Sequence, residues 1–155
     1  FSLAQSSFVE QLVKLCDKYG ISPGLLEIEI TESIRNAPEI DLKELIGKLR
    51  QAGFTVALDD FGTEYANLAL LSDAEFDILK LDKSLISNVA LNPRTKIIME
   101  YISKICHRLG LDMIAEGIES EEQFFTLCSY GVETVQGYLF SKPLAINVFE
   151  EKYLS

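Results

Sequence analysis

The sequence predicts an α/β protein with a parallel sheet, and three observations lead to this prediction. Short apolar runs of strand length recur five times, and segments with helical spacing of apolar residues separate them. With 155 residues and 48% hydrophobic content, the chain can bury the core of one domain or a large part of one. No glycine-rich nucleotide loop of the kind that opens a dinucleotide-binding sheet is present in the sequence. Strands that alternate with helices favour parallel pairing.

The expected helices have recognisable ends. Gly20 and Gly53 follow two apolar helical stripes, Asn92 precedes a third, and Ser120 with Gln123 has the spacing of a capping box. We expect helices at residues 8–19, 42–49, around 68–71, 93–109, from 120 to near 131, and from about 146.

The expected strands are residues 25–31, 54–58, 76–81, 111–115 and 133–136. In the first of these, Ile28 and Ile30 alternate with Glu27 and Glu29, so the glutamates share one face. Polar side chains recur at or just beyond the carboxyl ends: Glu29, Glu32, Asp59, Asp60, Lys80, Asp82, Glu116, Glu119 and Gln136. An open doubly wound sheet would spread the outer strands away from a common site. We therefore favour a (β/α)8 barrel, in which these ends converge on the catalytic face.

The composition excludes several classes of protein. A formal charge of −10 argues against nonspecific binding to nucleic acid or to a membrane surface, which basic patches drive. No apolar stretch is long enough to span a bilayer, and the first residues do not resemble a signal peptide. Cys16, Cys106 and Cys128 have no paired spacing, which favours a reducing cytoplasm and a position for each in the core.

Asp59 and Asp60 are the first candidates for chemistry. Adjacent carboxylates resist joint ionisation unless a cation or strong donors neutralise them, and hard divalent cations are the usual partners. The alternative is a turn in which an aspartate caps the following helix. Lys80 has two interpretations as well, since it could orient a water or a phosphate, or it could be a salt-bridged surface lysine. A site rich in carboxylate oxygens suits Mg²⁺ or Mn²⁺ and metal-assisted phosphodiester hydrolysis.

Five segments carry a resemblance to a known family. They are Leu26-Glu27-Ile28-Glu29-Ile30-Thr31-Glu32-Ser33, Leu58-Asp59-Asp60-Phe61-Gly62-Thr63, Leu79-Lys80-Leu81-Asp82, Ala115-Glu116-Gly117-Ile118-Glu119 and Val135-Gln136-Gly137-Tyr138. In this order they resemble the EAL family of bacterial cyclic-di-GMP phosphodiesterases. The resemblance implies a TIM-like barrel that uses two Mg²⁺ or Mn²⁺ ions to open the cyclic dinucleotide to linear pGpG.

The resemblance also implies roles for individual residues. Glu29, Asp59 and Asp60 would be metal ligands, with Asp59 shared by or close to both ions. Lys80 would hold the nucleophilic water, Glu116 would be general base or ligand of the second metal, and Gln136 would hydrogen-bond in the site. Glu32 would tether the loop after Asp60, and this loop would form a homodimer contact. Glu119 would support the metal ligands without contacting a metal itself.

Two departures from the family pattern change what we expect of this chain. The Glu-Ala-Leu motif and an asparagine ligand are not in the sequence, so residues 1–155 correspond to the carboxyl-terminal two-thirds of one EAL domain, and the fragment by itself should be inactive. Where the family reads Gly-Thr-Gly-Tyr-Ser-Ser, this chain has Glu64 in place of the second glycine, and Ala66 and Asn67 in place of the serines.

The alternative to a phosphodiesterase is a degenerate EAL domain that acts as a cyclic-di-GMP sensor or a protein-interaction module. The sequence does not identify the neighbouring domains of the parent protein.

Overall fold

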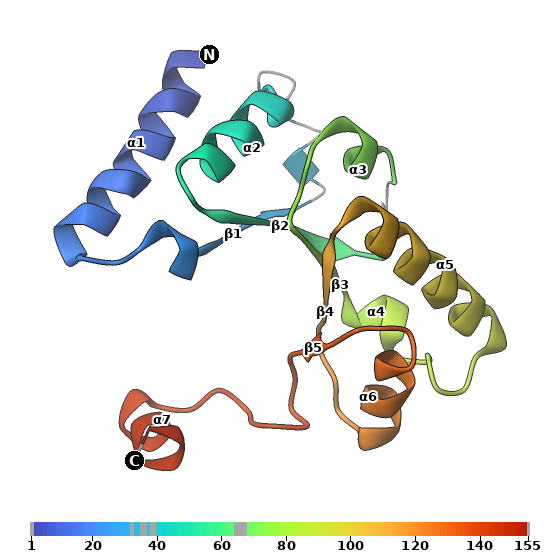
Figure 1. Cartoon of the computed structure of the whole chain (residues 1–155). Coiled ribbons are helices and arrows are strands. Elements are labelled where there is room, and N and C mark those ends of the chain that lie inside the picture. The colour runs from blue at the N-terminus through green and yellow to red at the C-terminus, as the bar shows by residue number, and fades with distance from the viewer. Residues whose placement is uncertain (1, 32, 35–36, 38–39, 64–67, 155) are drawn as a thin grey trace.

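The computed structural model describes residues 2–31, 33–34, 37, 40–63 and 68–154 (Figure 1). Its centre is a five-stranded sheet in the order β1-β2-β3-β4-β5, in which every neighbouring pair is parallel. The strands are β1 Glu27–Thr31, β2 Thr55–Phe61, β3 Ile78–Leu81, β4 Asp112–Ala115 and β5 Thr134–Val135. The predicted α/β class and parallel sheet are therefore confirmed.

Helices separate the strands along the chain. They are α1 Ser2–Tyr19, α2 Leu42–Gln51, α3 Ala69–Asp73, α4 Lys83–Ile86, α5 Pro93–Leu109, α6 Glu121–Cys128 and α7 Ile146–Tyr153, with a 3₁₀ turn η1 at Pro23–Leu25. Figure 1 shows α2, α3, α5 and α6 following one side of the sheet, while α7 lies apart after an extended segment. Each predicted helix is present, whereas α4 and η1 are additions that the apolar periodicity did not indicate.

The helix ends follow the predicted local chemistry. The Asn92 side chain accepts a hydrogen bond from the N–H of Arg94 at the start of α5, and Gly110 ends this helix with a φ of 70°. Ser120 and Gln123 form the complete capping box of α6. These interactions are local in sequence, which is why the sequence alone predicts them.

The core lies between the sheet and the helices on its covered side. Its fully buried side chains include Val56, Leu58, Leu79 and Leu81 from the strands, and Ile46, Leu49, Met99 and Leu127 from the helices. Cys16 and Cys106 are buried as predicted, but Cys128 is exposed, so the prediction is wrong there. Leu127 takes the inward position at the end of α6, and the next residue points about 100° away around the helix.

β1 and β5 are the two ends of the sheet in the part of the chain that the structure describes. The five strands therefore form part of a barrel wall rather than a closed barrel, in agreement with the expected incomplete barrel. Among the described residues, no helix combines the length and apolar character needed to cross a bilayer.

Candidate functional site

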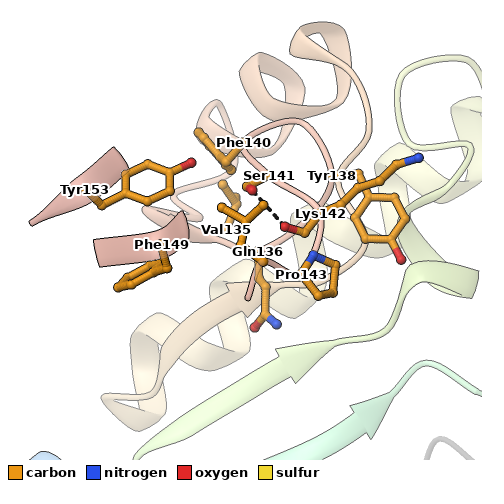
Figure 2. A pocket seen from close by; sticks show the side chains of 11 residues that line it. Val135, Gln136, Tyr138, Phe140, Ser141, Lys142, Pro143, Phe149 and Tyr153 are labelled. Carbon is orange, nitrogen blue, oxygen red and sulfur yellow. Dashed lines mark hydrogen bonds between the residues drawn. The ribbon is translucent and has the colours of Figure 1, made fainter. Parts of the chain in front are cut away.

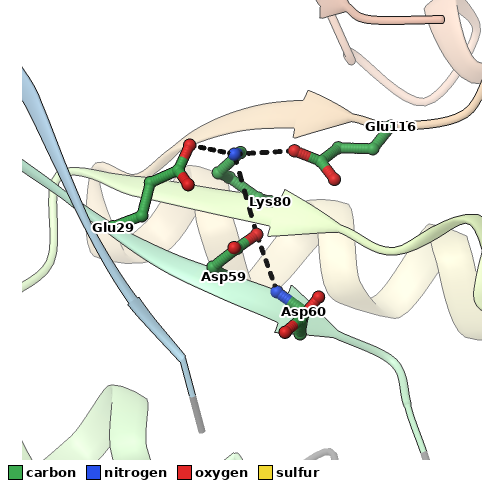
Figure 3. A network of polar contacts seen from close by, with 5 residues as sticks. All are labelled: Glu29, Asp59, Asp60, Lys80 and Glu116. Atoms are coloured by element: carbon green, nitrogen blue, oxygen red, sulfur yellow. Dashed lines mark hydrogen bonds and ion pairs between the residues drawn. The ribbon is translucent and has the colours of Figure 1, made fainter.

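The carboxyl ends of the parallel strands carry the acidic side chains that the sequence analysis singled out. Glu29 lies on β1, Asp59 and Asp60 on β2, Lys80 on β3, and Glu116 directly after β4. Because parallel strands end at one edge of a sheet, residues far apart in the sequence meet here (Figure 3). We call Glu29, Asp59, Lys80 and Glu116 the Lys80 cluster.

A β-bulge in β2 arranges the two aspartates. Leu58 pairs with Leu79 and Phe61 with Leu81, so Asp59 and Asp60 together lie opposite Lys80. Among the described residues, Asp60 is the only non-glycine residue with a positive φ, at 59°. Its N–H donates to Oδ1 of Asp59 at 2.9 Å, and Figure 3 shows its carboxylate directed away from Lys80. The bulge thus sends two consecutive carboxylates in different directions.

The helix-cap alternative for the aspartates is wrong for the described residues. The next helix, α3, begins at Ala69, and its N-cap position is Leu68, which makes no side-chain cap bond. The β2 strand also runs through both aspartates to Phe61 instead of ending at Leu58. Asp59 and Asp60 are therefore strand residues near the carboxyl end of β2.

Lys80 is the centre of the cluster. It is only 5% exposed, and its Nζ donates to Glu29, lies 2.6 Å from Oε1 of Glu116 and lies 3.7 Å from Oδ1 of Asp59. Burial alone lowers the pKa of Lys80, but hydrogen bonds to Glu116 and Glu29 and the charges of Glu116 and Asp59 outweigh it, so the pKa is raised. In this arrangement Lys80 is an ammonium ion that donates hydrogen bonds to the acids around it.

Two carboxyls near the cluster have perturbed pKa values. Burial raises the pKa of Glu27, which lies two residues before Glu29; Lys80 opposes this shift, and Glu29, Asp59 and Glu116 reinforce it. Burial also raises the pKa of Asp60, with further contributions from the charges of Asp59 and Asp82. Negative charge is therefore in excess at this edge, and the site favours an added cation.

The donor chemistry fits a hard divalent cation, because Glu29, Asp59 and Asp60 offer only carboxylate oxygens. Their present arrangement does not form a finished metal cage, since within the described part of the chain no group of three or more histidine, cysteine, aspartate or glutamate side chains is positioned to hold a metal ion. Lys80 forms ion pairs with three of these acids, Glu29, Asp59 and Glu116. Its ammonium group therefore supplies the positive charge that partly balances them.

Gln136 and Glu119 lie outside the Lys80 cluster. Gln136 is exposed just after β5 and lines a mostly apolar pocket of about 620 Å³ between residues 135–144 and α7, with Tyr138, Phe140 and Phe149 (Figure 2). Glu119 forms an ion pair with Lys83 of α4. The predicted loop tether Glu32 and the changed loop position Glu64 lie outside the described residues.

Asp82 and Lys83 lie beside the site, and the sequence analysis assigned neither of them an individual role. The Asp82 side chain caps α4 by accepting from the N–H of Ser84 at 2.8 Å, and hydrogen bonding to Ser84 lowers the pKa of Asp82. The signal was available, because an aspartate directly before Lys83-Ser84-Leu85 has the form of an N-cap. The helix was too short to produce an apolar period.

A buried lysine among carboxylates at the carboxyl ends of parallel strands forms an acidic site on the face where (β/α) barrels carry their functional groups. The sequence model of the EAL domain family matches residues 1–143, so this chain belongs to the EAL domain family.

Individual relatives agree with this assignment. The chain is 32% identical to "Cyclic di-GMP phosphodiesterase PA2567" of Pseudomonas aeruginosa over 96% of its own length and 25% of that protein. The solved EAL enzyme Bd1971, with cAMP and cyclic-di-GMP bound, is 32% identical with a TM-score of 0.86, over 94% of this chain and 39% of the other. Klebsiella pneumoniae BlrP1, solved with manganese and cyclic-di-GMP, is 32% identical with a TM-score of 0.80, over 87% and 34% of the two chains. The chain thus spans about a quarter to two fifths of the length of these proteins.

Proposed function

We propose that this chain supplies the greater part of the active site of a cyclic-di-GMP phosphodiesterase that produces linear pGpG. The observation that carries the proposal is the Lys80 cluster, in which a buried ammonium is surrounded by carboxylates at the carboxyl edge of an EAL-type sheet. The named activity of the relative PA2567 and the ligands of the structures Bd1971 and BlrP1 support the same substrate.

Glu29, Asp59 and Asp60 would hold Mg²⁺ or Mn²⁺. When bound, such an ion neutralises phosphate charge and lowers the pKa of a water. The Lys80 ammonium would donate hydrogen bonds to the attacking water or to a phosphate oxygen. Glu116, whose side chain is 27% exposed and whose Oε1 lies 2.6 Å from the Lys80 Nζ, would accept a proton from a water that Lys80 orients, or would bind a second ion.

Gln136 and Glu119 have supporting roles in this proposal. Gln136, with two amide donors and one acceptor, would contact the substrate from the β5 side. Glu119 would support the segment that carries Glu116 through its ion pair with Lys83. The proposal also includes a homodimer formed through the loop after Asp60, with a cytoplasmic location and further domains in the parent protein.

The test is the formation of pGpG from cyclic-di-GMP with Mn²⁺, measured by chromatography on a protein in which a Glu-Ala-Leu segment precedes this chain. Asp59→Asn should abolish turnover, because it removes a charge of the site. Asp112→Asn is the matched control: this exposed aspartate begins β4 at the opposite edge of the sheet, and its replacement should leave turnover unchanged. We expect no pGpG from residues 1–155 alone.

Three outcomes would contradict this proposal, the first two by excluding the activity and the third by excluding the site. Cyclic-di-GMP binding without turnover in the longer protein would favour the sensor alternative, and neither binding nor turnover would favour a protein-interaction module. Equal turnover in the Asp59→Asn variant and the unchanged protein would remove the Lys80 cluster from the mechanism.

A further inference from the structure

The short helix α4 is attached to the turn that follows the two aspartates. The Asp82 N–H donates to the carbonyl of Phe61 at 2.9 Å, and the Ser84 hydroxyl donates to the carbonyl of Gly62 at 3.3 Å. Gly62 has a φ of 107°, and a Cβ on it would lie 2.6 Å from Cβ of Leu85. The backbone after Asp59 and Asp60 therefore packs against α4 without room for a side chain.

The same helix contacts the turn that follows Glu116. Gly117 has a φ of 69°, and a Cβ there would lie 2.7 Å from Cβ and 2.8 Å from Cδ of Lys83. The Lys83 stem thus crosses directly over Gly117, and its ammonium donates to Glu119. Lys83 therefore contacts this turn at two points, both within three residues of Glu116.

Stability is a weak explanation for the pair of Lys83 and Glu119. The two side chains are 55% and 52% exposed, and ion pairs in water contribute little to folding. What the contact does is join α4 to the glycine-containing turn after β4. Such a turn has more conformational freedom than other backbone and benefits from an external contact.

We propose that Lys83 is a positioning residue, which holds the turn after β4 so that Glu116 stays beside Lys80. Since α4 also contacts the turn after Asp60, this one short helix touches both the turn that follows the β2 acids and the turn that follows Glu116. The consequence for turnover rests on the proposed function, whereas the positioning itself does not.

The positioning is tested on the chain itself by the amide signals of residues 116–119 in a ¹H–¹⁵N correlation spectrum. Lys83→Met should shift these signals, Glu119→Gln should shift the same ones, and the double variant should shift them no further. Lys83→Arg should restore the original positions, because it keeps the charge. Lys104→Met is the matched control, since Lys104 makes an exposed ion pair with Glu100 on α5, away from the site. Unchanged signals in Lys83→Met, or no recovery in Lys83→Arg, would overturn the proposal.

The catalytic consequence is measured on the longer protein described above. Lys83→Met should lower kcat on the order of tenfold with an unchanged KM, and Lys83→Arg should recover it, since small displacements of a catalytic group are costly. A full kcat in Lys83→Met would overturn the positioning role and leave the phosphodiesterase intact. If the unchanged protein forms no pGpG, the proposed function fails, and the amide signals decide on Lys83 alone.

Discussion

Lys80 holds a positive charge at a place from which water is almost excluded, and this depends on carboxylates from three other strand ends. A buried ammonium is costly unless it is paired and hydrogen-bonded. Glu29 and Glu116 provide the hydrogen bonds, and Asp59 adds charge. The interpretation of Lys80 as a salt-bridged surface lysine was half correct, since the lysine is ion-paired but not on the surface.

At Asp60 the same excess of negative charge predicts a gain in stability when the charge is removed. Burial and the charges of Asp59 and Asp82 raise its pKa, so the folded state binds the proton more tightly than the unfolded chain does. Ionisation at pH 7 therefore lowers stability, and this cost disappears as the pH falls below the unfolded-state pKa. Asp60→Asn should therefore raise the free energy of unfolding more at pH 7 than at pH 3, by a small amount because solvent screens the charge. Urea denaturation at the two pH values measures this difference, and an equal effect at both would contradict it.

At the scale of elements, β2 and the segment after β5 are fixed by neighbours that are distant in the sequence. The bulge in β2 appears only through its pairing with β3, and the course of the chain after Gln136 depends on residue 118. The Ile118 N–H donates to the carbonyl of Gln136 at 3.1 Å, and the Leu139 N–H donates to the carbonyl of Ile118 at 3.0 Å. The two segments therefore lie backbone against backbone at Gly137.

Gly137→Ala should consequently lower the free energy of unfolding by about 2 kcal/mol or more, because the added Cβ would lie 2.2 Å from the Ile118 carbonyl oxygen. Gly47→Ala is the control within the same chain: a Cβ at this position of α2 would meet no atom within 4 Å. It should raise stability by about 0.5–1 kcal/mol, because alanine favours a helix interior. Chemical denaturation compares both variants, and a tolerated Gly137→Ala would show that the segments can separate at little cost.

At the scale of the whole molecule, the described sheet ends in two strand edges, at β1 and β5. Unpaired N–H and C=O groups on an edge strand are templates for pairing with another chain. A sheet of five strands cannot close into an eight-stranded barrel, so these edges stay available in the chain by itself.

We therefore expect residues 1–155 to self-associate in solution. Light scattering coupled to size-exclusion chromatography should give a molar mass above the 17.4 kDa of one chain, and it should increase with concentration. A constant monomer mass across the concentration range would show that the edges are protected.

Local signals in the sequence were sufficient for much of this protein. Helix caps at Asn92 and Ser120, the alternation around Glu29 and the recurrence of polar residues after apolar runs depend only on near neighbours. They determined the α/β class, the order of the elements and the identity of the acids at the strand ends, because side-chain direction follows from the strand and helix periods.

Tertiary structure decided how these residues meet. The bulge that separates the directions of Asp59 and Asp60, the burial of Lys80 and the helix α4 that contacts two turns all depend on pairing between segments 20 or more residues apart. The missed burial of Lys80 and the exposure of Cys128 have one physical reason: a residue type gives its average environment, whereas the packed neighbours determine the actual one.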